Sequence, residues 1–438
     1  MPLDRAILAK GRTPLEYRRW LKRNEPENYK ADWFGELAII SHYIQNRHQP
    51  EGEQFRRLAI PLMHRYYRSL HPERGMALDI TENELVAEFA DLDTAPLRHI
   101  HNNTFTFIDL FAGIGGFRSA LQNVGGRCVF ASEFDQAAQH SYAYNYGVIP
   151  FGDITRPETK AAIPHGFDVL CAGFPCQPFS MAGLREGFAN QAKGTLFFDV
   201  LEILQQRHPR AFILENVPGL LSHDHGNTIR IIMNSLRGNI EEGGLGYLVP
   251  DPIILNAADF GCAQNRDRVF IVGFAPEEED AYEHFVFPDG HEFQQVNFGD
   301  IMEENPVERS YYMSDRYWHT LIAHREREHR NGRGYGYVIN NLNEPGHTLL
   351  TGGMGLERNL VRDLRTEPNE GEPDNRGRLN DDHIRVLTEE ECKRMQGFPA
   401  DFEIVVSRHA AYRQFGNSVA VPVIQAIAME IRRALLIL

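Results

Sequence analysis

The stretch Phe105-Thr-Phe-Ile-Asp-Leu-Phe111, followed at once by Ala112-Gly-Ile-Gly-Gly116, decides the fold class. The first seven residues are mostly apolar or aromatic and predict a buried strand, and the glycines predict a tight turn into a helix over residues 117–123. Two glycines close this helix, and the apolar run 128–132 predicts the next strand. Short strands that alternate with helices predict an α/β fold built around a parallel sheet.

The same alternation continues as far as residue 274. Apolar runs at 168–172, 211–214, 253–256 and 268–273 predict further strands, and residues 136–145, 196–206 and 228–236 predict helices between them. Together with the first two strands they predict a doubly wound sheet with helices on both faces. We therefore place a main domain at residues 104–274.

The flanking segments have a different texture. Residues 1–103 predict a helical N-terminal extension, in which basic side chains alternate with Tyr and Trp. Residues 275–384 are polar, with 23 Asp and Glu, 11 Arg and no Lys, and predict a small domain of irregular strands and loops. Helical patterns return at 388–396 and 421–436, so residues 385–438 are expected to rejoin the main domain.

Composition excludes several classes of protein. No apolar run approaches the roughly 20 residues of a membrane span, and the N-terminus lacks a secretory signal, so a cytoplasmic location is expected. The five cysteines are odd in number and widely spaced, which disfavours a disulfide framework and a zinc site. The formal net charge of −15 means that any surface for nucleic acid is local.

The glycine turn is expected to bind a ligand, because open α/β sheets bind ligands where their strands end. Glu133 ends the next predicted strand and Asp153 would lie at the end of a third connection, so with Asp109 they are expected to gather around one pocket. Three carboxylates would repel a pyrophosphate and attract a cation. S-adenosylmethionine, which joins a sulfonium and an ammonium to a neutral adenosine, has the required chemistry. The alternative is a turn that only lets a helix approach a strand.

Three further groups follow predicted strands. Cys176, in Pro175-Cys-Gln-Pro178, would be held on a stiff loop as a nucleophile, whereas Cys171 inside the strand is expected to be a buried apolar residue. Glu215 leaves an apolar strand, where desolvation would make it a proton donor, although it could instead cap a helix. Arg266 and Arg268 would supply fixed positive charge, or else form an exposed strand edge.

These motifs occur in a fixed order and resemble the DNA cytosine-5 methyltransferases. The resemblance covers the chain from about residue 104 to its end, interrupted by residues 275–384. Its motifs are the glycine turn, Pro175-Cys-Gln177, Glu215-Asn-Val217, Gln264-x-Arg266-x-Arg268, the segment 385–399 and Arg413-Gln-Phe-Gly-Asn-Ser-Val419. It implies a Rossmann-like methyltransferase sheet, with residues 275–384 as the target-recognition domain. Phe134 stands where the family often has Trp, and it can still stack on adenine.

The resemblance also assigns roles. Cys176 would attack cytosine, Glu215 would contact N3, and Arg268 would contact O2 with support from Arg266. The residues that would line the S-adenosylmethionine pocket are Phe111, Gly113, Ile114, Gly116, Glu133, Asp153, Ile154, Leu196, Asn417 and Ser418. The substrate would be double-stranded DNA whose target base is flipped out, and residues 179–194 are expected to close over it. We expect a monomer, and the resemblance is compatible with a functional pairing with a restriction endonuclease.

Several alternatives stay open. The chain could methylate cytosine in tRNA, or it could be a DNA-binding module that has lost catalysis. A nicotinamide dehydrogenase is disfavoured, because the glycine pattern differs from Gly-x-Gly-x-x-Gly. The arginines of 275–384 could read guanine or could pair with local acids such as Glu326, Glu328 and Asp363. The N-terminal extension could pack on the main domain, mediate self-association or contact DNA.

Overall fold

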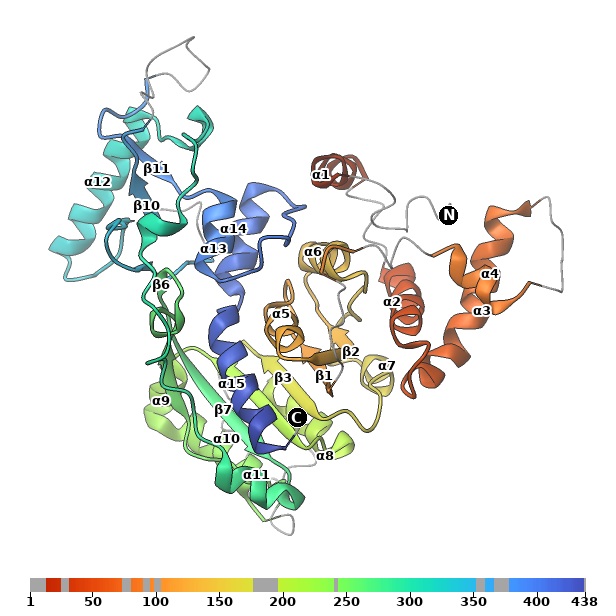
Figure 1. Ribbon diagram of the computed structural model, residues 1–438. Coiled ribbons are helices and arrows are strands. Elements are labelled where there is room, and N and C mark those ends of the chain that lie inside the picture. Colours follow the sequence, from red (N-terminus) through yellow and green to blue (C-terminus); the bar gives the residue numbers. More distant parts are fainter. Residues whose placement is uncertain are drawn as a thin grey trace.

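The structure is a computed structural model, shown in Figure 1. It describes residues 13–24, 31–72, 80–89, 95–97, 104–175, 196–239, 243–351, 359–365 and 378–436. The predicted nucleophile Cys176 and the expected closing loop at 179–194 lie outside these residues.

A six-stranded sheet forms the centre of the molecule, with the order β2-β1-β3-β4-β7-β5. Its strands are β1 (Phe105–Leu110), β2 (Gly126–Ser132), β3 (Val169–Gly173), β4 (Ala211–Asn216), β5 (Ile253–Asn256) and β7 (Asp267–Phe274). The strands predicted from the apolar runs are thus confirmed to within one or two residues. Nearly every residue of β1 to β4 is buried, as expected for strands covered on both faces.

One part of the sheet differs from the prediction of parallel strands. β7 runs antiparallel to both of its neighbours, β4 and β5. The cause is the short connection between β5 and β7, which contains a single-turn 3₁₀ helix, η7 (Ala257–Phe260), and the two-residue strand β6 (Gln264–Asn265). A parallel return needs a crossover of a dozen or more residues, usually with a helix, so this chain turns back on itself instead.

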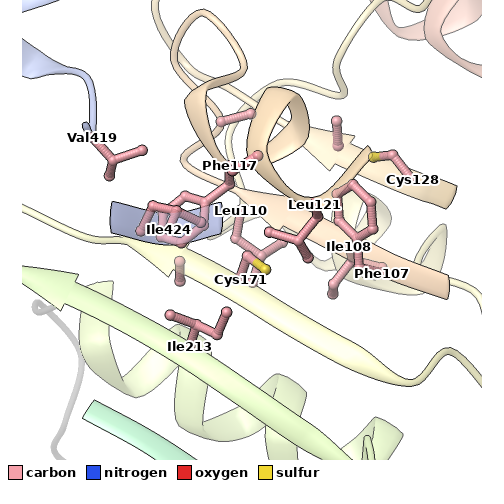
Figure 2. Packing of buried hydrophobic residues seen from close by; sticks show 14 of the residues in the cluster. Phe107, Ile108, Leu110, Phe117, Leu121, Cys128, Cys171, Ile213, Val419 and Ile424 are labelled. Carbon is pink, nitrogen blue, oxygen red and sulfur yellow. The ribbon is translucent and has the colours of Figure 1, made fainter. Parts of the chain in front are cut away.

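Helices pack against both faces of the sheet. They include α5 (Gly116–Asn123), α6 (Gln136–Tyr146), α7 (Pro157–Ala161), α8 (Leu196–Arg207), α9 (Gly219–Ser222), α10 (Asn227–Arg237) and the C-terminal α15 (Val421–Ala434). Figure 2 shows Phe117 and Leu121 of α5 close to Leu110 of β1 and Ile424 of α15, all of them buried. The end of the chain therefore completes the core that the first strand begins.

The N-terminal part is helical, as predicted for this segment. Its helices are α1 (Pro14–Asn24), α2 (Ala31–Asn46), α3 (Gly52–Leu70) and α4 (Glu82–Ala87). Helix α2 packs beside β2 at one edge of the sheet, α3 and α4 lie outside it, and α1 lies near α6 (Figure 1). Helices α2 and α3 pack on each other, and their buried residues join the same core as the sheet. Of the three interpretations of this segment, packing on the main domain is the one that these contacts support.

Part of the chain beyond β7 forms a second, smaller unit at the opposite end of the molecule (Figure 1). It contains a three-stranded sheet, β11-β10-β8, and a small core around Trp318, Leu321 and Leu360. Its elements are α12 (Asp315–Arg330), β8 (Val338–Ile339), β10 (Asn359–Arg362) and β11 (Ile384–Val386). Helix α11 (Glu279–His284) instead packs on β7 and α15 of the main domain, and β9 (Gly346–His347) pairs with β6. The 16-residue helix α12 was not expected, since irregular strands and loops were predicted here.

The chain then returns to the main sheet through α13 (Glu389–Met395) and α14 (Arg408–Asn417), which precede α15. The expected domain boundary, between residues 384 and 385, falls inside β11, which pairs with β10. In the described part of the chain, no helix has the length and apolar character that crossing a membrane requires.

Candidate functional site

A cavity of about 640 Å³ lies where β1 to β4 end. Most of the residues predicted for the cofactor and for catalysis line it: Phe111, Gly113, Ile114, Glu133, Asp153, Ile154, Leu196, Glu215, Arg266, Arg268, Asn417 and Ser418. Pro175, the last described residue before Cys176, lines it as well. The structure therefore brings together side chains that are more than 300 residues apart in the sequence.

The glycine turn forms one wall of this cavity. Gly113 and Gly115 have φ angles of 56° and 86°, a region that residues with a Cβ rarely adopt. A Cβ on Gly115 would lie 2.3 Å from the ring of Tyr146, whose hydroxyl donates to the Gly115 carbonyl at 2.9 Å. Tyr146 of α6 thus packs against the glycine turn and fixes its position.

Gly116, predicted to line the pocket, lies behind its wall. It is buried and absent from the cavity lining, and a Cβ there would come within 2.7 Å of the Ser418 hydroxyl and of Val419. Its glycine therefore allows α5 to approach the loop before α15, which carries Asn417 and Ser418.

Glu133 is fixed by backbone donors at the end of β2. The Gly113 N–H donates to its Oε2 at 2.7 Å, and the Asp135 N–H donates to its Oε1 at 2.6 Å. Burial raises the pKa of the Glu133 carboxyl, while these two N–H groups oppose that change. Glu133 therefore ties the glycine turn of β1 to the turn after β2.

The expected group of three carboxylates is reduced to two, because Asp109 is wrongly placed in that prediction. Its side chain is fully buried in β1 and does not line the cavity. Burial raises the pKa of the Asp109 carboxyl well above its usual range. Asp153 does line the cavity, and its Oδ1 accepts hydrogen bonds from the backbone and hydroxyl of Thr155 at 2.9 and 2.8 Å.

Phe134 is the aromatic residue beside these carboxylates. Its side chain is 77% exposed although it is large and apolar, and it lines the cavity next to Glu133 and Asp153. An exposed ring at a cavity wall offers a stacking surface for a flat ligand.

Glu215 and Arg268 form an ion pair on the opposite side of the cavity. Arg268 Nε lies 3.0 Å from Glu215 Oε1, and both side chains are largely buried. Burial raises the pKa of the Glu215 carboxyl, and the positive charges of Arg268 and Arg266 oppose this only in part. Glu215 is therefore easier to protonate than an ordinary glutamic acid.

Arg266 is oriented by backbone carbonyls and, among the described residues, forms no ion pair with an acid. Its guanidinium donates to the carbonyls of Gly416, Ser418 and Leu349 at 3.0, 2.8 and 3.4 Å. Burial lowers its pKa to about 9. Arg266 thus joins Gly416 and Ser418, at the end of α14, to Leu349. It acts on Glu215 through its charge.

Two contacts at this site were not predicted as functional. Asn216 donates from Nδ2 to the Phe174 carbonyl at 2.9 Å, which joins the end of β4 to the segment before Cys176. Arg413 lines the cavity and pairs with Asp135 at 2.8 Å, which joins α14 to the turn after β2. Both residues stand in the recognised motifs, but the sequence does not show which groups they contact.

The cavity fits S-adenosylmethionine. Carboxylates at Glu133 and Asp153 suit a ligand with positive charge and ribose hydroxyls, and Phe134 suits adenine. The ion pair of Glu215 with Arg268 lies in the same cavity, which leaves room for a second, base-like reactant beside the cofactor.

Comparisons with known proteins agree with this geometry. Residues 105–433 match the family model for the C-5 cytosine-specific DNA methylase. The Type II methyltransferase M.HpaII of Haemophilus parainfluenzae is 50% identical over 327 residues, which cover 75% of this chain and 89% of that relative. M.SsoII of Shigella sonnei is 42% identical over 357 residues, covering 80% and 86%.

A solved structure shows the same fold. The methyltransferase Dnmt2 of S. pombe matches with a TM-score of 0.54 and 19% identity, over 75% of this chain and 98% of that one. The family match spans three quarters of the chain. The chain therefore belongs to the C-5 cytosine-specific DNA methylases, enzymes that transfer a methyl group from S-adenosylmethionine to cytosine in DNA.

Proposed function

We propose that this enzyme methylates cytosine within a specific sequence of duplex DNA by covalent catalysis at Cys176, after flipping the target base out of the helix. The observation that carries the proposal is the pairing of Glu215 with Arg268 at 3.0 Å in the cavity that also holds the carboxylates Glu133 and Asp153. An acid with a raised pKa and a fixed cation are what a cytosine ring needs on its N3 and O2 side.

The cofactor is assigned to the wall formed by Phe111, Gly113, Ile114, Glu133, Asp153, Ile154, Leu196, Asn417 and Ser418. When bound, S-adenosylmethionine supplies an electrophilic methyl group. The carboxylate of Glu133, held by two backbone N–H groups, accepts from the ribose hydroxyls, and Phe134 stacks on adenine.

The chain's own residues activate the base. Carbon 5 of cytosine is a weak nucleophile, so the Cys176 thiolate bonds to carbon 6 and turns the ring into an enamine. Glu215 donates its proton to N3 and Arg268 donates a hydrogen bond to O2, where negative charge develops. Carbon 5 of the enamine then takes the methyl group that the bound cofactor would supply, and the broken C–S bond of the sulfonium would leave a neutral thioether. Loss of the carbon 5 proton to a base such as water expels the Cys176 thiolate and restores the ring, and N3 returns its proton to Glu215. The base must leave the duplex first, which costs a few kcal/mol.

The remaining assignments concern the molecule's setting. We assign residues 275–384 to target recognition and propose that the enzyme works in the cytoplasm. The names of the relatives M.HpaII and M.SsoII, both Type II methyltransferases, support a role in restriction–modification with a partner endonuclease.

A mechanism-trapping duplex tests the nucleophile. DNA that carries 5-fluorocytosine at the target cannot lose its carbon 5 substituent, so it should remain bonded to the full-length enzyme when S-adenosylmethionine is present. The Cys176→Ala variant should bind the same DNA without forming the adduct, and Cys171→Ala serves as the control because Cys171 is buried within β3. An adduct on Cys176→Ala, or none on the wild type, would contradict the proposal.

The substrate is tested separately. Methyl incorporation is measured into duplex DNA and into tRNA under the same conditions, and we expect it in duplex DNA alone. Bisulfite sequencing of host DNA with and without the gene then identifies the target sequence. Incorporation confined to tRNA would refute the assignment of DNA.

A further inference from the structure

Strand β2 lies at the edge of the six-stranded sheet, and among the described residues its outer side is bridged to another extended segment only at Phe151. Helix α2 supplies further partners for its backbone. Asn46 donates from Nδ2 to the Val129 carbonyl at 3.2 Å, and Gln45 donates to the Cys128 carbonyl. An unpaired edge would otherwise leave polar backbone groups without partners. The family model begins at residue 105, so α2 lies outside the part shared with that family.

His42 of α2 occupies the most informative position along this edge. Its Nδ1 donates to the Ala38 carbonyl at 2.8 Å, and its Nε2 accepts from the Ala131 N–H at 3.1 Å. The side chain is fully buried. Burial lowers the pKa of His42 to about 3, so the ring is neutral and Nε2 keeps its acceptor lone pair throughout the physiological range.

The same ring touches both segments that lead to the cofactor carboxylates. Ala131 stands two residues before Glu133. The centroid of the Phe151 ring, two residues before Asp153, lies 4.7 Å from that of His42. The two segments also bond to each other, because the Phe151 N–H donates to the Ala131 carbonyl and the Glu133 N–H donates to the Phe151 carbonyl, both at 2.8 Å.

A second cavity lies on the other side of this wall. It has a volume of about 560 Å³, lies between the N-terminal helices and the main domain, and shares Phe134, Gly152 and Asp153 with the cofactor cavity. These shared residues separate the two cavities at this point, and the His42 ring packs against Phe151, which directly precedes Gly152.

We propose that His42 is a positioning residue for the cofactor site. From outside the shared family domain, His42 holds the turns of Glu133 and Asp153 at the separation that cofactor binding requires. The inference rests on the proposed cofactor role of these two carboxylates. It gives the N-terminal extension a function in S-adenosylmethionine binding, rather than in contact with DNA.

The test measures the dissociation constant of S-adenosylmethionine by calorimetry on the full-length protein. His42→Phe keeps the ring packing but leaves the Ala131 N–H unpaired, so we expect binding about tenfold weaker, equivalent to about 1.4 kcal/mol. His42→Gln restores an acceptor and should recover most of the affinity. The kcat at saturating cofactor and the affinity for duplex DNA should stay within about twofold of the wild type.

Tyr43→Phe is the matched control. Tyr43 is the next residue of α2 and is also buried, but its hydroxyl donates to Glu82 of α4 and not to β2. Its loss should loosen the N-terminal helices without changing cofactor affinity. Equal weakening by Tyr43→Phe, or wild-type affinity in His42→Phe, would overturn the proposal.

Two further measurements separate the possible failures. If His42→Phe does not fold, Asn46→Ala removes a neighbouring contact with β2, and unchanged cofactor affinity in that variant counts against the proposal. Glu133→Ala tests the underlying assignment, since it must weaken S-adenosylmethionine binding if Glu133 holds the cofactor. Weakening by Glu133→Ala but not by His42→Phe would refute only the positioning role.

Discussion

Glu215 illustrates how the position of one residue in the fold sets its chemistry. It stands near the end of β4, with its carboxyl buried beside Arg268, and burial raises its pKa. The protonated form therefore persists to higher pH than in an exposed glutamic acid, and in the proposed mechanism it is this form that donates to N3. As the pH rises through the pKa of Glu215, the enzyme should lose activity.

Replacing Glu215 by Gln tests this role. The amide keeps the shape and can donate a hydrogen bond, but it cannot transfer a proton, so kcat should fall at least about a hundredfold. The alkaline decline of kcat that Glu215 causes in the wild type should also disappear. Steady-state rates across pH check both effects, with Asp251→Asn as the control because Asp251 is 92% exposed. An unchanged alkaline decline would mean that another group titrates there.

Single residues also show where prediction from sequence succeeds and fails. Glu133, Asp153, Glu215 and Arg268 follow or border predicted strands, and the strand order alone brings them to one cavity. Asp109 was expected at the cavity although it stands inside a strand that was predicted to be buried, and its side chain lies in the core instead. Arg266 was expected to support the base, and its orientation depends on carbonyls 83 to 152 residues away in the sequence, which no local pattern shows.

Among the helices and strands, one element that was not predicted is α12, and its sequence pattern is weak. Helix α12 carries many Arg, His and Glu side chains, and few of its residues, among them Trp318 and Leu321, are buried. The apolar periodicity that identifies a helix is therefore faint, although Ser314 caps its N-terminus by accepting from the Tyr317 N–H. The pairing of arginines with local acids is confirmed for Glu328 and Asp363.

A buried charge network joins the smaller unit to the returning chain. Arg385 of β11 is fully buried and lies 2.9 Å from Asp363 and 2.7 Å from Glu391, which also accepts from the Thr388 N–H at the start of α13. Its side chain thus connects β10, β11 and α13. Hydrogen bonds from Arg365 and Arg385 hold the pKa of Asp363 below its usual range, against the effect of burial.

We predict that Arg385→Met destabilises the protein by about 3–5 kcal/mol, because it leaves the buried carboxylate of Glu391 without its cation and removes one of the two arginines that pair with Asp363. Arg378→Met removes the exposed pair of Arg378 with Asp381 and should cost at most about 1 kcal/mol. Urea unfolding, followed by fluorescence of Trp318 in the adjacent small core, compares the two variants. Equal losses would show that burial of the network contributes nothing beyond an ordinary surface pair.

For the whole molecule, the net charge of −15 bears directly on how the enzyme meets DNA. Taken as a whole, the chain repels a polyanion, and residues 275–384, assigned to recognition, hold 23 acidic residues against 11 arginines. Within that segment Arg327 and Arg333 pair with Glu328, so these guanidinium groups are already partly neutralised. Binding must therefore rely on a limited set of basic groups placed against the phosphates.

The dependence of DNA affinity on salt measures that set. Salt has two opposing effects here, since it screens the general repulsion but also weakens binding that releases counterions from DNA. If a local basic surface neutralises about six phosphates, the affinity for duplex DNA should fall about a thousandfold between roughly 50 and 200 mM salt. Titrations of the full-length enzyme with labelled duplex, with saturating S-adenosylmethionine, give the slope, and cofactor affinity measured over the same range serves as the control. An affinity for DNA that stays constant or rises with salt would show that the general repulsion dominates, and that no such local surface exists.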